Sequence, residues 1–85
     1  MKIIFSKHII QNKIPLLKER EFTVTKKQIE ETIKTPDHID KTSDFPKEIA
    51  SKDLNKRHVL RVVYKIEGDI IKAITVYPAE KGRYY

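Results

Sequence analysis

Cysteine is absent from the 85-residue sequence, and glycine occurs only twice. Without cysteine the chain has no disulfide, no thiolate zinc site and no cysteine nucleophile. Because the two glycines, Gly68 and Gly82, lie far apart, there is no glycine-rich phosphate loop or dinucleotide-binding motif. His8, His38 and His58 are dispersed without the spacing of metal ligands. We therefore expect no cofactor and no metal site.

Long apolar runs are also missing. Uninterrupted apolar stretches such as Ile3, Ile4 and Phe5 are short, whereas a membrane-spanning helix needs roughly 20 apolar residues. We therefore expect no membrane association and a cytoplasmic location. The length of 85 residues and mass of 10.0 kDa suit one small core. The sequence predicts a single domain over residues 1–85.

Positive charge is in excess. Lysine and arginine number 18 against 12 acidic residues, which gives a formal charge of +6 and a pI near 9.6. Residues 51–85 carry 8 of the basic and 4 of the acidic side chains. This balance favours a polyanionic partner such as nucleic acid, or an acidic protein. A merely solvated surface is an equally valid interpretation of the charge alone.

The first half of the chain predicts a strand followed by two helices. Residues Lys2–Phe5 form a short apolar strand, and Ser6 is a suitable N-cap for a helix. Pro15 removes a backbone donor, so we expect a kink or two short helices near residues 12–15. Thr25 lies three residues before Gln28, which is the spacing of a capping box at the start of the second helix.

The second half has the alternating pattern of strands. Strands are predicted over residues 39–45, 48–54, 57–67 and 70–77, and Gly68 with Asp69 suits a two-residue hairpin turn. Consecutive strands joined in this way form an antiparallel meander. The expected fold class is α+β, with two N-terminal helices packed on one face of a small antiparallel sheet.

In the predicted hairpin over residues 57–77, successive side chains of each strand point to opposite sides, so the hairpin has two different faces. One face is apolar and predicts the core: His58, Leu60, Val62, Tyr64 and Ile66. The other is basic and interleaved with Val59, Val63, Ile74 and Val76; its charged members include Arg57, Arg61, Lys65 and Glu67. A turn at residues 68–69 pairs Tyr64 with Ala73, Val62 with Thr75, Leu60 with Tyr77, Arg61 with Val76, and Lys65 with Lys72.

Two lysines across from each other repel, and a bound anion would relieve that repulsion. The basic face is therefore either a phosphate-binding surface or an ordinary solvated face. Residues 77–85 add Lys81, Arg83, Tyr84 and Tyr85. Arginine binds phosphate with two donors and tyrosine stacks on bases, which suits single-stranded RNA. A frayed terminus whose tyrosines cover the edge of the core is the alternative.

Three segments resemble a known group: FSKHII (residues 5–10), IKTPDHI (33–39) and HVLRVVYKIEGDIIKAITVYPAEKGRYY (58–85). Together they resemble an uncharacterised family of small bacterial and archaeal proteins that is similar in pattern to the RelE and BrnT type ribonuclease toxins. The resemblance implies a β-α-α-β-β-β fold, with an additional early strand in the meander. It also implies metal-independent cleavage of messenger RNA, in many cases on the ribosome, and neutralisation by a cognate antitoxin protein.

In that chemistry the RNA 2′-hydroxyl is the nucleophile and cations stabilise the phosphorane. The resemblance implies Arg61 and Arg83 as phosphate-stabilising groups, with Lys52 and Lys81 as supporting cations, and no obvious general base follows Arg61. Either Tyr84 or Tyr85 would stack on a base or move a proton, and the expected catalytic set is Arg61, Arg83 and Tyr84. The expected RNA-binding set consists of Lys52, Lys81 and Tyr85 together with Lys65 and Lys72, which follow from the pairing of the predicted hairpin. Two other hypotheses stay open: a non-catalytic module that binds nucleic acid or an acidic protein, and a strand-swapped homodimer without RNA binding. The protein is expected to be a monomer or a homodimer.

Overall fold

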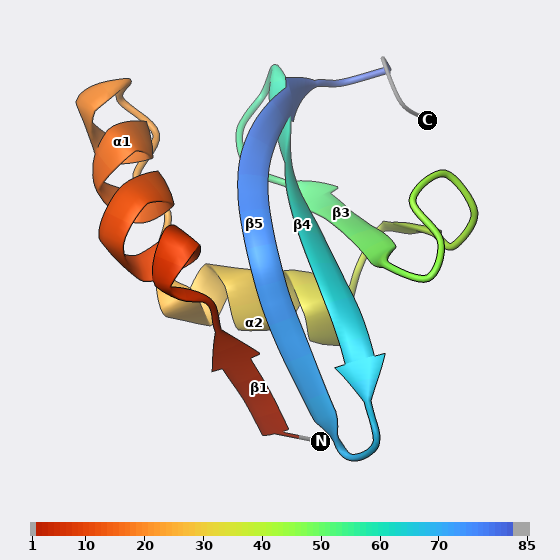
Figure 1. The fold of residues 1–85 in the computed structure, drawn as a ribbon. Coiled ribbons are helices and arrows are strands. Elements are labelled where there is room, and N and C mark those ends of the chain that lie inside the picture. Colours follow the sequence, from red (N-terminus) through yellow and green to blue (C-terminus); the bar gives the residue numbers. More distant parts are fainter. Residues whose placement is uncertain (1, 83–85) are drawn as a thin grey trace.

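The computed structural model describes residues 2–82, which build an α+β fold around one five-stranded sheet (Figure 1). In chain order the elements are β1 (Lys2–Phe5), the π-helix η1 (His8–Lys13), α1 (Ile14–Glu19), α2 (Lys26–Lys34), β2 (His38–Asp40), β3 (Glu48–Asp53), β4 (His58–Glu67) and β5 (Ile70–Glu80). The strand order is β1-β5-β4-β3-β2. The predicted α+β class, with the helices between the first strand and a four-strand meander, is confirmed.

β1 is the strand that departs from the predicted sheet. Strands β2 to β5 are antiparallel in sequence order, but β1 runs parallel to β5, with Lys2 beside Ile70 and Phe5 beside Ala73. The expectation of a purely antiparallel sheet is therefore wrong at this edge. The helices and strands β2 to β4 separate β1 from β5 in the sequence, and parallel neighbours need a long connection, of about a dozen residues or more. β1 lies beside the turned end of the β4–β5 hairpin (Figure 1).

Ser6 connects β1 to the first helical segment and is hydrogen-bonded on both sides. Its Oγ accepts a hydrogen bond from Ile9 N at 3.1 Å and donates one to Ile74 O at 2.7 Å. The capping role predicted for Ser6 is confirmed. The same side chain also fixes the start of the helix to β5.

Pro15 marks the junction between η1 and α1. Proline has no N–H to donate, so the regular α-helical ladder cannot run through it. The preceding turn is wider, and Ile14 N donates to Ile9 O in the five-residue pattern of a π-helix. The predicted interruption near residues 12–15 is confirmed.

The end of α1 has the two hydrogen bonds of a Schellman motif. Phe22 N donates to Leu17 O at 2.8 Å, and Glu21 N donates to Lys18 O at 3.1 Å. Glu21 takes the left-handed position with φ 67°, which is normally occupied by glycine. The chain then turns toward α2, and Phe22 packs against the core.

α2 begins at the predicted capping box. Thr25 Oγ1 accepts from Gln28 N at 3.1 Å, and Gln28 Oε1 accepts from Thr25 N at 2.8 Å. The helix buries Ile29 and Ile33 and ends at Thr35, directly before Pro36.

β2 is shorter than the strand predicted over residues 39–45. It ends at Asp40, whose Oδ1 accepts hydrogen bonds from the backbone N–H groups of Thr42 and Ser43, both at 3.0 Å. Such local side-chain bonds favour a turn over a ladder. They also hold the pKa of Asp40 well below its ordinary value, because Ser43 and then Thr42 donate to the charged carboxylate.

The β4–β5 hairpin has the predicted turn but not the predicted register throughout. Gly68 takes φ 60° in the two-residue turn, and the pairing of Tyr64 with Ala73 is as expected. Beyond this point β5 contains one extra residue, Ile74, so that Val63 pairs with Thr75. This β-bulge shifts every later pair by one position.

The consequence is a corrected set of neighbours. Beyond the bulge the expected partners are wrong by one residue: Val62 pairs with Val76, Arg61 with Tyr77, and Leu60 with Pro78. β5 also continues through Pro78, where the sequence predicts its end. β1 accompanies β5 only as far as Ala73, so the outer side of β5 at Pro78 needs no donor.

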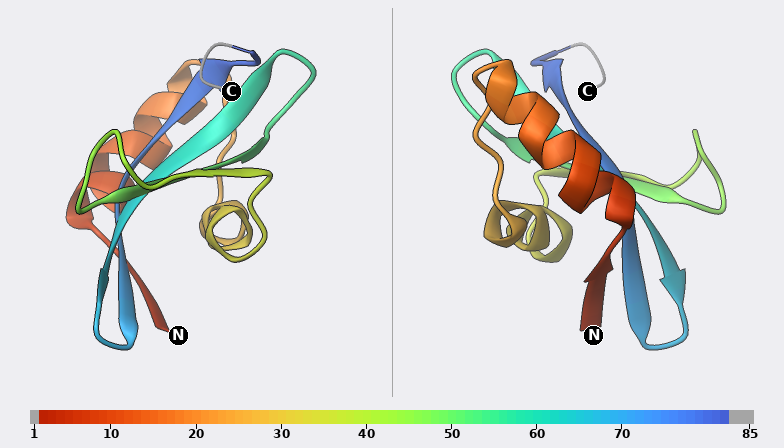
Figure 2. Two further views of the ribbon diagram at one scale, coloured as in Figure 1. Left: turned by 90° about the vertical axis from the view of Figure 1, so that its right-hand side faces the viewer. Right: turned by 60° about the vertical axis from the view of Figure 1, so that its left-hand side comes forward.

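The core lies between the helices and one face of the sheet. Figure 1 shows the first helical segment beside β5 and α2 crossing behind the central strands, and Figure 2 turns this arrangement by 60° and 90°. Leu60, Val62 and Tyr64 of β4 join the helix residues in this core, as predicted. Two other members of the predicted core face differ: Ile66 is 45% exposed and His58 is partly exposed.

Candidate nucleic-acid interface

The sheet face opposite the core, called the open face below, carries most of the predicted binding residues. Since Leu60, Val62 and Tyr64 face the helices, the alternate residues of β4 face the other way. The register and the bulge put their cross-strand neighbours on the same face. Along the hairpin the open face consists of Arg57, Val59, Arg61, Val63 and Lys65, with Lys72, Thr75, Tyr77, Ala79 and Lys81.

The middle of the open face is buried. Arg61 is 3% exposed, and its neighbours along β4, Val59 and Val63, are 2% and 6% exposed. Arg61 Nε donates to Tyr77 Oη at 2.9 Å, and Nη1 donates to Ser51 Oγ at 3.4 Å. A buried guanidinium requires such partners because its desolvation is costly. The sequence predicts a solvated basic face here, whereas Arg61 lies inside a packed cluster.

The end of the β4–β5 hairpin next to the turn at residues 68–69 carries the predicted lysine pair. Lys65 and Lys72 are directly opposite each other, and Glu67 lies between their charges, with carboxylate oxygens 3.8 Å from Lys65 Nζ and 2.9 Å from Lys72 Nζ. The ammonium of Lys72, more than that of Lys65, holds the pKa of the Glu67 carboxyl below its ordinary value. The repulsion that we expected an external anion to relieve is thus already relieved by an internal carboxylate.

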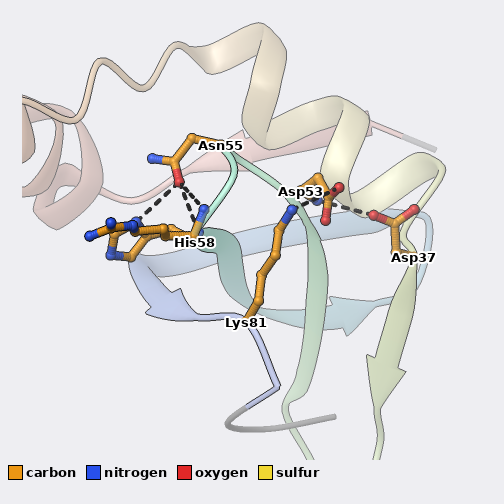
Figure 3. Close-up of polar contacts among 6 residues, drawn as sticks. Asp37, Asp53, Asn55, His58 and Lys81 are labelled. Atoms are coloured by element: carbon orange, nitrogen blue, oxygen red, sulfur yellow. Dashed lines mark hydrogen bonds and ion pairs between the residues drawn. The ribbon is translucent and has the colours of Figure 1, made fainter.

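The opposite end of the hairpin carries a second pair of cations. Lys81 N donates to Arg57 O at 2.9 Å, which extends the β4–β5 pairing beyond the strand ends. Lys81 Nζ lies 3.2 Å from Asp53 Oδ2, and Asp53 N in turn donates to Asp37 Oδ2 at 3.0 Å (Figure 3). The position of the Lys81 ammonium is therefore tied to the end of β3.

A surface pocket of about 550 Å³ opens at this end. Within the described part of the chain it is lined by Arg57, His58, Glu80 and Lys81. Two cations, one imidazole and one carboxylate are thus adjacent to one cavity. The β4–β5 pairing beyond the bulge puts His58 opposite Glu80 and Arg57 beside Lys81. Because the sequence patterns do not reveal the bulge, neither the pocket nor the roles of Arg57, His58 and Glu80 follow from them.

His58 is held in one orientation by its own loop. Asn55 Oδ1 accepts from Arg57 N at 2.9 Å and from His58 N at 2.8 Å, and it lies 3.1 Å from His58 Nδ1 (Figure 3). The imidazole and the Phe22 ring pack in a T-shaped arrangement, with ring centroids 5.0 Å apart and planes at 82°. Residues 55 and 56, which separate the strands predicted over residues 48–54 and 57–67, lie in the connection between β3 and β4, and Asn55 is the signal that the sequence patterns left unused.

The structure groups some of the predicted binding residues and separates others. Lys65, Lys72 and Lys81 share the open face with the buried Arg61. Lys52 of β3 pairs with Leu60, which faces the helices, so Lys52 lies on the helix side of the sheet. There its Nζ donates a hydrogen bond to Thr35 Oγ1 at 2.7 Å. The predicted residues Arg83, Tyr84 and Tyr85 lie outside the described residues.

Across residues 2–82 no three or more His, Cys, Asp or Glu side chains gather where they could hold a metal ion. In the same range, no helix combines the length and the apolar character that crossing a membrane requires. No protein-family model matches the chain, and no significant match to a curated protein or to a solved structure was found.

Proposed function

We propose that the protein binds single-stranded RNA on the open face and acts as a RelE-like toxin of a toxin–antitoxin pair. The observation that carries the proposal is the shared face of four cations, Arg57 and Lys65 on β4 with Lys72 and Lys81 on β5. Arg57 and Lys65 are eight positions apart, on the order of 26 Å along a strand. A row of this length can contact several phosphates of one RNA chain and release their counterions.

The net charge of +6 supports the same proposal. A positive field attracts RNA at a distance, and the two outer cation pairs then fix its path along the hairpin. In this proposal the buried Arg61 contributes its charge and orients Tyr77, while Arg83, Tyr84 and Tyr85 follow Lys81 in the sequence and add further contacts. A cognate antitoxin protein would cover the same basic face.

The binding proposal is tested with a charge-reversal pair and a matched control. Lys72→Glu/Lys81→Glu changes two open-face cations, and Lys27→Glu/Lys34→Glu changes the net charge equally on α2. Fluorescence anisotropy of a labelled single-stranded RNA is measured at several salt concentrations. We expect the open-face variant to bind at least about tenfold more weakly, with a shallower salt dependence. Equal losses in both variants would contradict a defined RNA site.

The toxin part of the proposal has its own test. Induction of the wild-type chain should arrest growth and cut messenger RNA on translating ribosomes. A non-catalytic module that binds nucleic acid or an acidic protein is the second candidate, and the burial of Arg61 favours it, because that guanidinium already binds Tyr77 and Ser51. Salt-dependent RNA binding without growth arrest or RNA cleavage would support the non-catalytic module and contradict the toxin.

A further inference from the structure

The hydrogen bonds around His58 determine which ring nitrogen carries the proton. Asn55 Oδ1 accepts from two backbone N–H groups, those of Arg57 and His58, so the atom facing them is the carbonyl oxygen and not the amide nitrogen. The same oxygen lies 3.1 Å from His58 Nδ1. Because a carbonyl oxygen can only accept, Nδ1 must be the donor. In the neutral imidazole, Nε2 then has the free lone pair.

The surroundings of this ring suit proton transfer beside a phosphate. His58 lines the pocket of about 550 Å³ together with Arg57, Lys81 and Glu80. Phe22 packs against the imidazole in a T-shaped pair and Asn55 holds Nδ1, so the ring has little freedom to turn. Histidine is the most common general base, and a second group that holds the other ring nitrogen is the usual orienting device. No such base was identified from the sequence.

We propose that His58 is the general base of RNA cleavage in this pocket, with Asn55 as its positioning residue. The proposal rests on the RNA binding proposed above, and it adds a general base with its positioning residue for the 2′-hydroxyl cleavage that the resemblance implies. His58 Nε2 takes the proton of a ribose 2′-hydroxyl, and the 2′-oxygen forms a bond to the adjacent phosphorus. The bond from phosphorus to the 5′-oxygen breaks, and that oxygen takes a proton from water. The imidazolium returns its proton to solvent.

The products of this step are a 2′,3′-cyclic phosphate and a 5′-hydroxyl end. Negative charge builds up on the phosphoryl oxygens during the attack, and the Arg57 guanidinium and Lys81 ammonium stabilise it from the pocket wall. Asp53 holds the Lys81 side chain at 3.2 Å. DNA lacks the 2′-hydroxyl, so the substrate class is RNA.

The experiment follows cleavage of a labelled single-stranded RNA by the full chain, with product ends identified by mass spectrometry. His58→Ala should lower the cleavage rate by about 10²- to 10⁴-fold while RNA affinity changes less than about twofold. Free imidazole added to His58→Ala should restore part of the rate. His8→Ala, at an exposed histidine of η1, is the matched control and should cleave normally.

Asn55 is tested by its conservative variant. Asn55→Asp retains an oxygen that accepts from Nδ1, whereas Asn55→Ala removes it. We expect Asn55→Asp to cleave several-fold faster than Asn55→Ala at equal thermal stability. If both variants cleave at the same rate, Asn55 does not position the base.

The wild-type chain provides a test that does not depend on a variant folding. An RNA with a single 2′-deoxy nucleotide at the cleaved position should resist cleavage there and still bind. RNA that is bound but not cut, or cut equally by wild type and His58→Ala, overturns the role of His58 and leaves RNA binding intact. Absence of RNA binding by the wild type would instead overturn the proposed function itself.

Discussion

Tyr77 Oη accepts a hydrogen bond from Arg61 Nε at 2.9 Å, across the β4–β5 pair in the middle of the open face. Arg61 is only 3% exposed, so water cannot readily replace a lost partner. We expect Tyr77→Phe to lower the free energy of unfolding by about 1–3 kcal/mol, measured by urea denaturation. Tyr64→Phe is the comparison, because Tyr64 donates to Glu48, which is partly exposed and can be rehydrated. A larger loss in Tyr64→Phe than in Tyr77→Phe would contradict this ranking.

Ser6→Ala should destabilise the protein more than loss of an ordinary helix cap. The substitution removes both the bond from Ile9 N and the bond to Ile74 O. One cap is worth about 1 kcal/mol and a further hydrogen bond about 1 kcal/mol, so we expect a loss of about 2 kcal/mol. Thr23→Ala, at an exposed position between α1 and α2, is the control and should change stability little. Equal effects of the two substitutions would show that the link to β5 has no energetic weight.

Glu21→Gly should stabilise the chain, although it removes a side chain. Glu21 has φ 67° at the end of α1, a conformation that costs a non-glycine residue about 1–2 kcal/mol. Part of that gain is lost to the greater freedom of glycine in the unfolded chain. We expect a net rise of about 1 kcal/mol. The reciprocal substitution, Gly68→Ala at φ 60°, should lower stability by a similar amount. Thermal melts of both variants test this, and a lower Tm for Glu21→Gly would count against it.

Acid should selectively weaken the turn that ends β2. The pKa of Asp40 is lowered from its ordinary value of 3.8, first by Ser43 and then by Thr42. Because the folded pKa is below the unfolded one, the stabilisation is present above about pH 4 and is lost as the pH falls through the folded pKa. The advantage of wild type over Asp40→Asn should therefore shrink as the pH is lowered below about 4. Denaturation at a series of pH values measures it; a constant difference would refute the assignment.

Glu67→Gln should strengthen RNA binding. Glu67 neutralises Lys65 and Lys72 at the turned end of the hairpin, so its carboxylate competes with phosphate for both. We expect tighter binding and a salt slope that is steeper by up to about 0.7 for each additional phosphate contact. Glu31→Gln, at an exposed position of α2, changes the net charge by the same amount elsewhere and is the control. Identical gains in both variants would indicate a general charge effect and no local competition.

Local patterns predicted the elements whose causes are local. Ser6, Pro15 and the Thr25–Gln28 capping box act within one helical turn, and the residues that define the 68–69 turn are adjacent. The parallel pairing of β1 with β5 involves segments at opposite ends of the sequence, so no local pattern contains it. The shortened β2 depends on how Asp40 binds the turn that follows it.

For the candidate site, alternation correctly put Lys65 and Lys72 on one face, because that part of the hairpin lies between the turn and the bulge. It did not reveal that Arg61 is buried, since burial depends on neighbouring strands. Alternation put His58 on the core face of the predicted hairpin, and no local pattern links its ring to Asn55. The contact between them becomes visible only when the loop geometry is known.

The extra residue at Ile74 determines which way the second half of β5 faces. Without it, Val76 would leave the core, Tyr77 would turn toward the helices, and Lys81 would part from Arg57. A deletion of a single codon there would therefore exchange the inside and outside of the β5 side chains that follow Ile74, while the same deletion in the exposed loop over residues 41–44 would leave the hairpin untouched. Natural length variation in this chain is for this reason expected to be confined to such loops and excluded from the bulge.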